Sequence, residues 1–159
     1  MIPNFYIVDT KRNIRRGGQP VGDDYKTLSG SGITKIVKLN TESEGSDQQA
    51  LDIGMSVFLC PIPFIEQIIT GPDEQKILAA LDFIDDNTFI HCGSVARTLS
   101  KPDIKQPDDR GGNDRTGYLV ARWRVKNGWS KFSAHLEALR FNFHWEELGL
   151  DKAWAEVKE

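Results

Sequence analysis

The sequence has few of the features that mark secreted, membrane-bound or nucleic-acid-binding proteins. It contains only two cysteines in 159 residues, so we expect no disulfide framework. No apolar run approaches the length of a membrane span, and the N-terminus shows no basic start followed by an apolar signal segment. A formal net charge of -3 is too small to indicate nucleic acid or a membrane as a partner. We therefore expect a cytoplasmic, monomeric protein.

The composition indicates one ordinary globular domain over residues 1–159. Hydrophobic residues make up 39% of the chain and charged residues 27%, which is typical of a folded domain and argues against disorder. A chain of this length buries a sizeable core without disulfides or metals.

Strand and helix patterns alternate along the chain. We expect strands at 4–8, 13–20, 34–39, 55–60 and 88–92, and helices at 22–30, 46–54, 71–85, from 116 onward and at 150–158. Ser46 and Gln49 can form a capping box on the second helix. Near the C-terminus a helix has an apolar stripe made of Phe132, Leu136, Leu139 and Phe143. The alternation predicts an α/β fold with a central, mostly parallel sheet of four to five strands flanked by helices.

A cysteine stands at the end of the strand 88–92, where ligands bind in sheets of this type. Further along, RGGNDRTG at 110–117 combines two glycines, an arginine and the start of an amphipathic helix. Backbone amides in a glycine-rich turn form an anion nest, and a helix N-terminus adds about half a positive charge. A guanidinium offers two parallel donors to phosphate oxygens. Such a field can also lower the pKa of a cysteine from about 8.5 to about 3.5–7.5, which makes the thiolate available as a nucleophile.

These segments resemble the signature of the protein tyrosine phosphatase superfamily, in which His-Cys is followed by five residues, then Arg and Ser or Thr. The ending GGNDRTG is similar to the variant of dual-specificity phosphatases, and the order of features agrees over about residues 5–145. The resemblance implies Cys92 as nucleophile and Arg115 as phosphate clamp. It also implies that Gly111, Gly112, Asn113, Asp114, Arg115 and Thr116 bind the phosphate, with a hydrogen bond from Thr116 to the sulfur.

The spacing departs from the family pattern. Arg115 lies 23 positions after Cys92 where the family has six, so the chain carries 17 additional residues, which fall at about 93–109. This stretch is polar, has no clear periodicity and is expected to loop out. Either it leaves the phosphate cradle at its rim, as a lid or substrate-selecting flap, or it displaces Cys92 from the cradle. Arg97 is one position short of the family spacing and lacks neighbouring glycines, so we do not expect it to be the clamp.

Phosphoryl transfer from an ester also needs a proton donor for the leaving oxygen. The family usually supplies it from the loop after the strand that ends at Cys60, where Glu66 and Asp73 lie. We expect Asp73 to cap the following helix. Asp114, inside the cradle, is the alternative implied by the resemblance to myotubularin-like sites. Glu66 and Asp114 therefore both remain candidates.

Other polar residues have less specific interpretations. We expect His91 to support the cysteine loop by hydrogen bonding. The spacing of the histidines indicates no metal site, and phosphoryl transfer through a cysteine requires no cofactor. Glu42, Glu44 and Asp47 form an acidic turn, which by default we expect to be a solvated loop with a helix cap, whereas the resemblance implies a place near the rim of the site. Arg15 and Arg16 are expected in a solvated turn, with attraction of an anionic substrate as the alternative.

The sequence thus predicts a phosphatase that hydrolyses phosphomonoesters through a phosphocysteine. The substrate is either a phosphorylated protein, at phosphotyrosine or with dual specificity, or a phosphorylated small molecule. The alternatives are a catalytically impaired domain that binds phosphate or a phosphorylated partner, and a rhodanese-like sulfurtransferase, which would not need Arg115 at the helix start.

Overall fold

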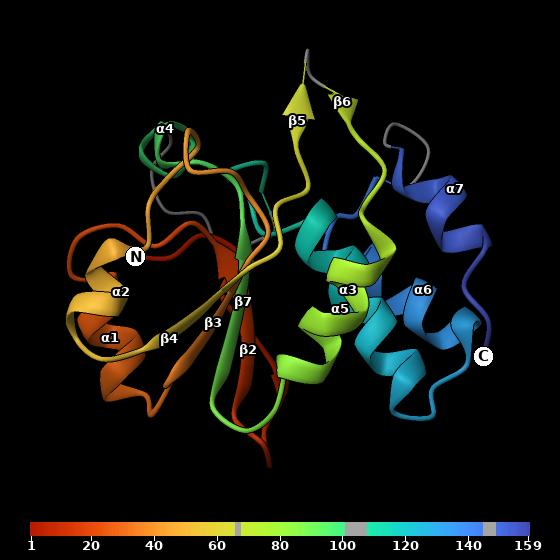
Figure 1. Cartoon of the computed structure of the whole chain (residues 1–159), viewed down its shortest axis with the longest axis horizontal. Helices are drawn as coiled ribbons and strands as arrows, with labels where there is room; N and C mark the ends of the chain where they lie inside the picture. Colours follow the sequence, from red (N-terminus) through yellow and green to blue (C-terminus); the bar gives the residue numbers. More distant parts are fainter. Residues whose placement is uncertain (66–67, 101–107, 145–148) are drawn as a thin grey trace.

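A five-stranded sheet forms the centre of the computed structural model, which describes residues 1–65, 68–100, 108–144 and 149–159 (Figure 1). Its strands lie in the order β1-β2-β7-β3-β4, and only the pair β1 and β2 is antiparallel. Their bounds are β1 Tyr6–Asp9, β2 Ile14–Gly18, β3 Lys35–Lys38, β4 Ser56–Leu59 and β7 Thr88–Cys92. The prediction of an α/β fold with a mostly parallel sheet is confirmed.

Helices cover both faces of this sheet (Figure 1). On one face lie α1 (Asp24–Gly30) and α2 (Gln48–Asp52). On the other, α5 (Asp114–Lys126) packs against β7, and the helices around α5 are α3 (Glu74–Phe83), α6 (Lys131–Arg140) and α7 (Leu150–Ala155). Two further elements were not predicted: a hairpin of β5 (Phe64–Ile65) and β6 (Ile68–Ile69), and a short helix α4 (Val95–Leu99).

Along each central strand, successive side chains point to opposite faces of the sheet. Ile36 and Phe89 belong to the core cluster beneath α1 and α2, whereas their neighbours Val37 and Ile90 belong to the larger cluster beneath α5. This alternation follows from the period of two in a strand. Because both faces are covered, β7 is buried at all five positions, TFIHC.

The register brings the carboxyl ends of three strands together at one edge. Gly18 of β2 pairs with Cys92 of β7, and Lys38 of β3 pairs with His91. The loops that follow β2, β3 and β7 therefore meet beside Cys92. This is the edge where ligands bind in parallel sheets.

Two local predictions are wrong. The predicted apolar stripe of α6 points mostly outward, since Phe132 is 72% exposed and Leu136 and Leu139 are also exposed. Ala134 and Ala138 are buried instead, because small side chains let α6 approach α5 closely. The residue directly before α2 is Asp47 rather than Ser46, and the Asp47 carboxylate makes no cap hydrogen bond, although the Ser46 hydroxyl accepts one from the amide of Gln48 at 3.1 Å. In contrast, Asp73 caps α3 as predicted, accepting hydrogen bonds from the amides of Gln75 and Lys76.

Within the described ranges, none of the helices combines the length and the apolar character needed to cross a bilayer.

Candidate active site

The long excursion after Cys92 leaves and rejoins the cradle at a single point. Gly93 and Gly111 both have positive φ angles, +100° and +113°. A Cβ atom on Gly93 would lie 3.0 Å from the Cα of Gly111, and one on Gly111 would lie 2.8 Å from the Cα of Gly93. Only glycine at both positions permits this approach. The 17 additional residues therefore do not pull Cys92 away from the segment 111–115.

The returning segment is fixed to the N-terminal part of the chain. The side-chain amide of Asn4 donates to the carbonyls of Asp108 and Gly111, at 3.1 and 2.7 Å, and its oxygen accepts from the amide of Asp108 at 3.0 Å. The buried Asp108 carboxylate accepts from the amide and Nε of Arg110 at 2.7 and 2.8 Å. These contacts set where the chain re-enters the cradle.

Cys92 and Arg115 face one cavity of about 410 Å³. Its other walls come from five segments of the chain and consist of Glu44, Phe64, Ile69, Gly93, Ser94, Arg97, Asp109, Gly111, Gly112, Asn113, Asp114 and His144. Burial alone would lower the pKa of Arg115, but hydrogen bonding to Glu44 and attraction to the sulfur of Cys92 raise it above its ordinary value.

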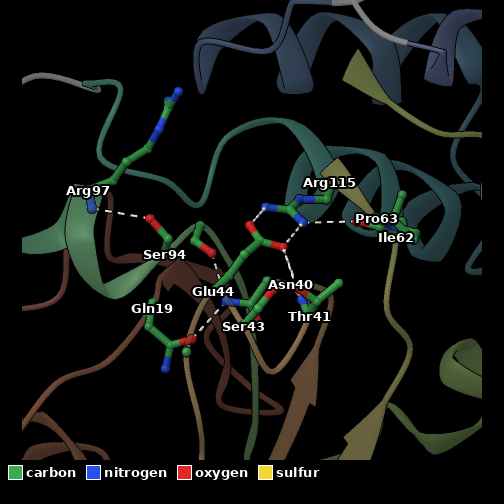
Figure 2. A network of polar contacts seen from close by, with 12 residues as sticks. Gln19, Asn40, Thr41, Ser43, Glu44, Ile62, Pro63, Ser94, Arg97 and Arg115 are labelled. Carbon is green, nitrogen blue, oxygen red and sulfur yellow. Dashed lines mark hydrogen bonds and ion pairs between the residues drawn. The ribbon is translucent and has the colours of Figure 1, made fainter. Parts of the chain in front are cut away.

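A carboxylate holds the Arg115 guanidinium in place. Arg115 donates from Nη1 and Nη2 to the two oxygens of Glu44, at 2.9 and 2.6 Å, and from Nη1 to the carbonyl of Ile62 at 2.9 Å (Figure 2). Burial would raise the pKa of Glu44, but Arg115 and Thr41 outweigh it and lower the pKa. The default expectation of a solvated turn is therefore wrong for Glu44, which lines the cavity, in agreement with the place near the site rim that the resemblance implies. The paired geometry fixes both the position and the plane of the guanidinium.

A second buried network supports the strand end beneath Cys92. His91 Nε2 lies 2.5 Å from an oxygen of Asp47, whose other oxygen accepts from the Tyr25 hydroxyl at 2.5 Å and from Gln19 at 3.0 Å. Burial would raise the pKa of Asp47, but His91, Tyr25 and Gln19 outweigh it and lower the pKa to about 2. Asp47 is thus a buried carboxylate, not a residue of a solvated turn, and it fixes the orientation of the His91 ring.

The same network reaches the start of the excursion. Asn40 donates from Nδ2 to the carbonyl of Gly93 and to the Gln19 side chain, both at 2.7 Å (Figure 2). The buried Lys38 ammonium donates to the Asn40 side chain and to the carbonyl of Gly45. The loop after β3 therefore holds both the acidic turn and the backbone that follows Cys92.

Of the two predicted proton donors, Asp114 lies at the cavity. It begins α5 and accepts a hydrogen bond from the backbone amide of His144 at 3.0 Å, and the ring Nδ1 of His144 lies 3.3 Å away. Burial raises the pKa of Asp114 despite these contacts. Glu66, the other candidate, lies outside the described residues.

The remaining cradle residues form a close-packed turn. Gly112 has a φ of +87°, and a Cβ atom there would lie only 2.4 Å from the carbonyl carbon of Gly17 in β2. The cradle therefore sits directly against the sheet edge. Thr116 Oγ1 is buried and forms no hydrogen bond with any of the described residues, which include Cys92. The bond that we expected from Thr116 to the Cys92 sulfur is therefore not formed.

Solved structures share this architecture. The core catalytic domain of the PP-IP phosphatase SIW14 from S. cerevisiae, in complex with citrate, superposes with a TM-score of 0.67 at 20% identity, covering 100% of this chain and 88% of that chain. Tk-PTP in its active form superposes with a TM-score of 0.61 at 22% identity, covering 88% of this chain and 85% of that chain. PTPMT1 in complex with PI(5)P superposes with a TM-score of 0.64 at 12% identity, covering 94% of this chain and 93% of that chain. The fold is that of protein tyrosine phosphatase-like enzymes. No protein-family model and no curated protein sequence matches the chain.

On this phosphatase fold the excursion places a cation at the rim of the cavity. Ser94 caps α4 by accepting a hydrogen bond from the amide of Arg97. The Arg97 guanidinium donates to the carbonyl of Asp109 at 3.1 Å and lies 5.9 Å from the ring centre of Phe64. No contact joins its side chain to the pair of Glu44 and Arg115 (Figure 2). The cavity thus has one arginine in the cradle and another at its rim.

Proposed function

We propose that this protein hydrolyses phosphomonoesters through a phosphocysteine on Cys92, within one domain that carries an insertion at about 93–109. One observation carries the proposal: Cys92 and Arg115 line the same cavity although 23 positions separate them in the chain. The glycines at both ends of the excursion explain how this is possible.

The chemistry follows from the positions of these groups. Backbone amides of 111–115 and the N-terminus of α5 receive the phosphate, and Arg115 binds two of its oxygens. The Cys92 thiolate attacks phosphorus, a sulfur–phosphorus bond forms, and the bond from phosphorus to the ester oxygen breaks. A carboxylic acid gives its proton to that leaving oxygen. Water then attacks the phosphocysteine, the carboxylate takes a proton from it, and phosphate and the thiolate are released.

Asp114 is the proton donor that we propose. It lines the cavity, and burial raises the pKa of its carboxyl group, which favours the protonated form that a general acid needs. Glu66 stays an alternative donor. Replacement of each by the amide distinguishes them. Only loss of the true acid should make the rate fall steeply as the leaving group becomes more basic, because that group then leaves without a proton.

The substrate that we propose is a small phosphomonoester with a second anionic group. Arg97 at the rim offers a charge for that group, and a cavity of about 410 Å³ is within the range of small-ligand sites. Two of the solved structures with this fold are a PP-IP phosphatase and PTPMT1 bound to PI(5)P. Arg97→Ala should raise KM about tenfold for a bisphosphorylated substrate and leave KM for p-nitrophenyl phosphate within twofold. Equal changes for both substrates would contradict this assignment.

The test of the activity is hydrolysis of p-nitrophenyl phosphate by the wild type and by Cys92→Ser. We expect turnover by the wild type and none by this variant. Cys60→Ser is the matched control, since Cys60 is also buried but does not line the cavity, and it should retain activity. A folded wild type that binds phosphate without turnover would show instead the impaired, phosphate-binding domain, and turnover of thiosulfate would show a sulfurtransferase.

A further inference from the structure

Arg16 lies in the middle of β2 and is almost fully buried, with 1% of its surface exposed. The expectation of a solvated turn is therefore wrong for this residue. A buried arginine ordinarily pairs with a carboxylate. Within the described residues, no carboxylate lies within ion-pair distance of Arg16, and its Nε and Nη1 atoms form no hydrogen bond. The position of this cation thus needs another explanation.

The guanidinium contacts the back of the phosphate cradle. Its Nη2 donates to the carbonyl of Gly112 at 2.9 Å and to that of Asn113 at 3.3 Å. On its other side the group lies over the ring of Phe141, 4.6 Å from the centroid. The aromatic face is a favourable neighbour for a cation that lacks an anionic partner. Arg16 is therefore held between an aromatic ring and two cradle carbonyls.

These two contacts orient the amides that a phosphate would meet. In a planar trans peptide the carbonyl oxygen and the next N–H point in opposite directions. Because the carbonyls of Gly112 and Asn113 turn toward Arg16, the amides of Asn113 and Asp114 turn the other way. Both of these residues line the cavity on that side.

Arg16 also adds positive charge behind the site. Burial lowers the pKa of Arg16 to about 10, and attraction to the nearby sulfur of Cys92 opposes this decrease. At neutral pH the group is therefore charged. Arg115 from α5 is also attracted to Cys92, and Glu44, Arg97, Asp109 and Asp114 are charged groups that line the same cavity. A buried charge in this low-dielectric position acts strongly on an anion on the other side of the cradle.

We infer that Arg16 is a positioning residue of the anion site, which fixes the cradle amides from behind and supplies a second buried positive charge to the bound phosphate. This inference rests on the proposed function, because it assigns the cradle as the phosphate site. It predicts that phosphate affinity depends on a residue that does not line the cavity.

The experiment measures the dissociation constant of inorganic phosphate by calorimetry for the full chain and three variants. Arg16→Met removes the charge and both hydrogen bonds and should weaken binding by about ten- to a hundredfold. Arg16→Lys keeps the charge but loses the paired geometry and should weaken it by about three- to tenfold. Arg15→Met is the matched control, since the Arg15 side chain contacts Asn13 and Phe5 instead, and should bind like the wild type.

A folded Arg16→Met or Arg16→Lys protein that binds phosphate within twofold of the wild type would overturn the inference. Should both variants fail to fold, nitrogen NMR of the wild type replaces them: phosphate should shift the Arg16 Nε resonance and leave that of Arg15 in place, and no shift at Arg16 would overturn the inference. Phosphate binding that depends on Arg16 in a protein without turnover would refute the proposed hydrolysis alone. A wild type that binds no phosphate would refute both.

Discussion

Replacing Asp47 by Asn should destabilise the protein strongly although Asp47 does not line the cavity. Its carboxylate accepts from Tyr25 and Gln19 and pairs with His91, and its side chain is 2% exposed. The pKa of Asp47 falls from 3.8 to about 2. A shift of this size corresponds to about 2 kcal/mol of stability at neutral pH, and strain in the remaining buried partners adds about 1 kcal/mol. We expect Asp47→Asn to reduce the free energy of unfolding by about 2–4 kcal/mol.

The pH dependence tests the origin of this loss. A carboxyl group with a lowered pKa stabilises the fold above its unfolded pKa, and this contribution disappears as the pH falls through the folded pKa. We measure the free energy of unfolding in urea for the wild type and Asp47→Asn. The difference between them should be largest at pH 6–7 and about half as large at pH 3. Asp23→Asn is the control, because the Asp23 side chain is 91% exposed, and it should change stability by less than about 0.5 kcal/mol. A difference for Asp47→Asn that grows on acidification would refute the reasoning.

Three further predictions concern the cradle and the residues that support it. Glu44→Gln weakens the fixed geometry of Arg115, so kcat/KM for an aryl phosphate should fall about tenfold in protein that is still folded. An unchanged kcat/KM would show that Arg115 is positioned without Glu44. Asp114→Asn should lower kcat by about a hundredfold or more. Because burial raises the pKa of this carboxyl group, the variant should be at least as stable as the wild type at pH 7. The difference in their free energies of unfolding should vanish below about pH 3.8. Gly112 and Gly54 both have a φ of +87°, but only at Gly112 would an added Cβ atom meet the backbone of another segment. Urea unfolding should therefore show Gly112→Ala to be at least about 2 kcal/mol less stable than the control Gly54→Ala. Equal losses of stability would refute the close approach.

The sheet and the position of the candidate site could be predicted because their signals are local. The strand 88–92 is a continuous apolar run that ends in Cys92, and the glycines before Arg115 mark a turn at a helix start. Both signals arise from burial and backbone geometry, which the sequence of a short segment largely determines.

The supporting residues could not be predicted because their roles depend on distant partners. Glu44 and Asp47 appear in the sequence as members of a polar turn, yet each is buried against a residue from another element, Arg115 or His91. Arg16 gives no sign in the sequence that its partners are carbonyls nearly a hundred positions away. The α6 stripe failed for a related reason, since periodicity indicates an apolar face but not that alanines provide the closer packing against a neighbouring helix.

The central claim is that Cys92 and Arg115 act on one phosphate. It is tested most directly by quenching the wild type in acid during turnover of an aryl phosphate and mapping covalent phosphate by mass spectrometry. We predict one phosphoryl group on the peptide that contains Cys92, absent from Cys92→Ser and strongly reduced in Arg115→Ala. Hydrolysis that continues in Cys92→Ser, or phosphoryl transfer to another residue, would contradict the account.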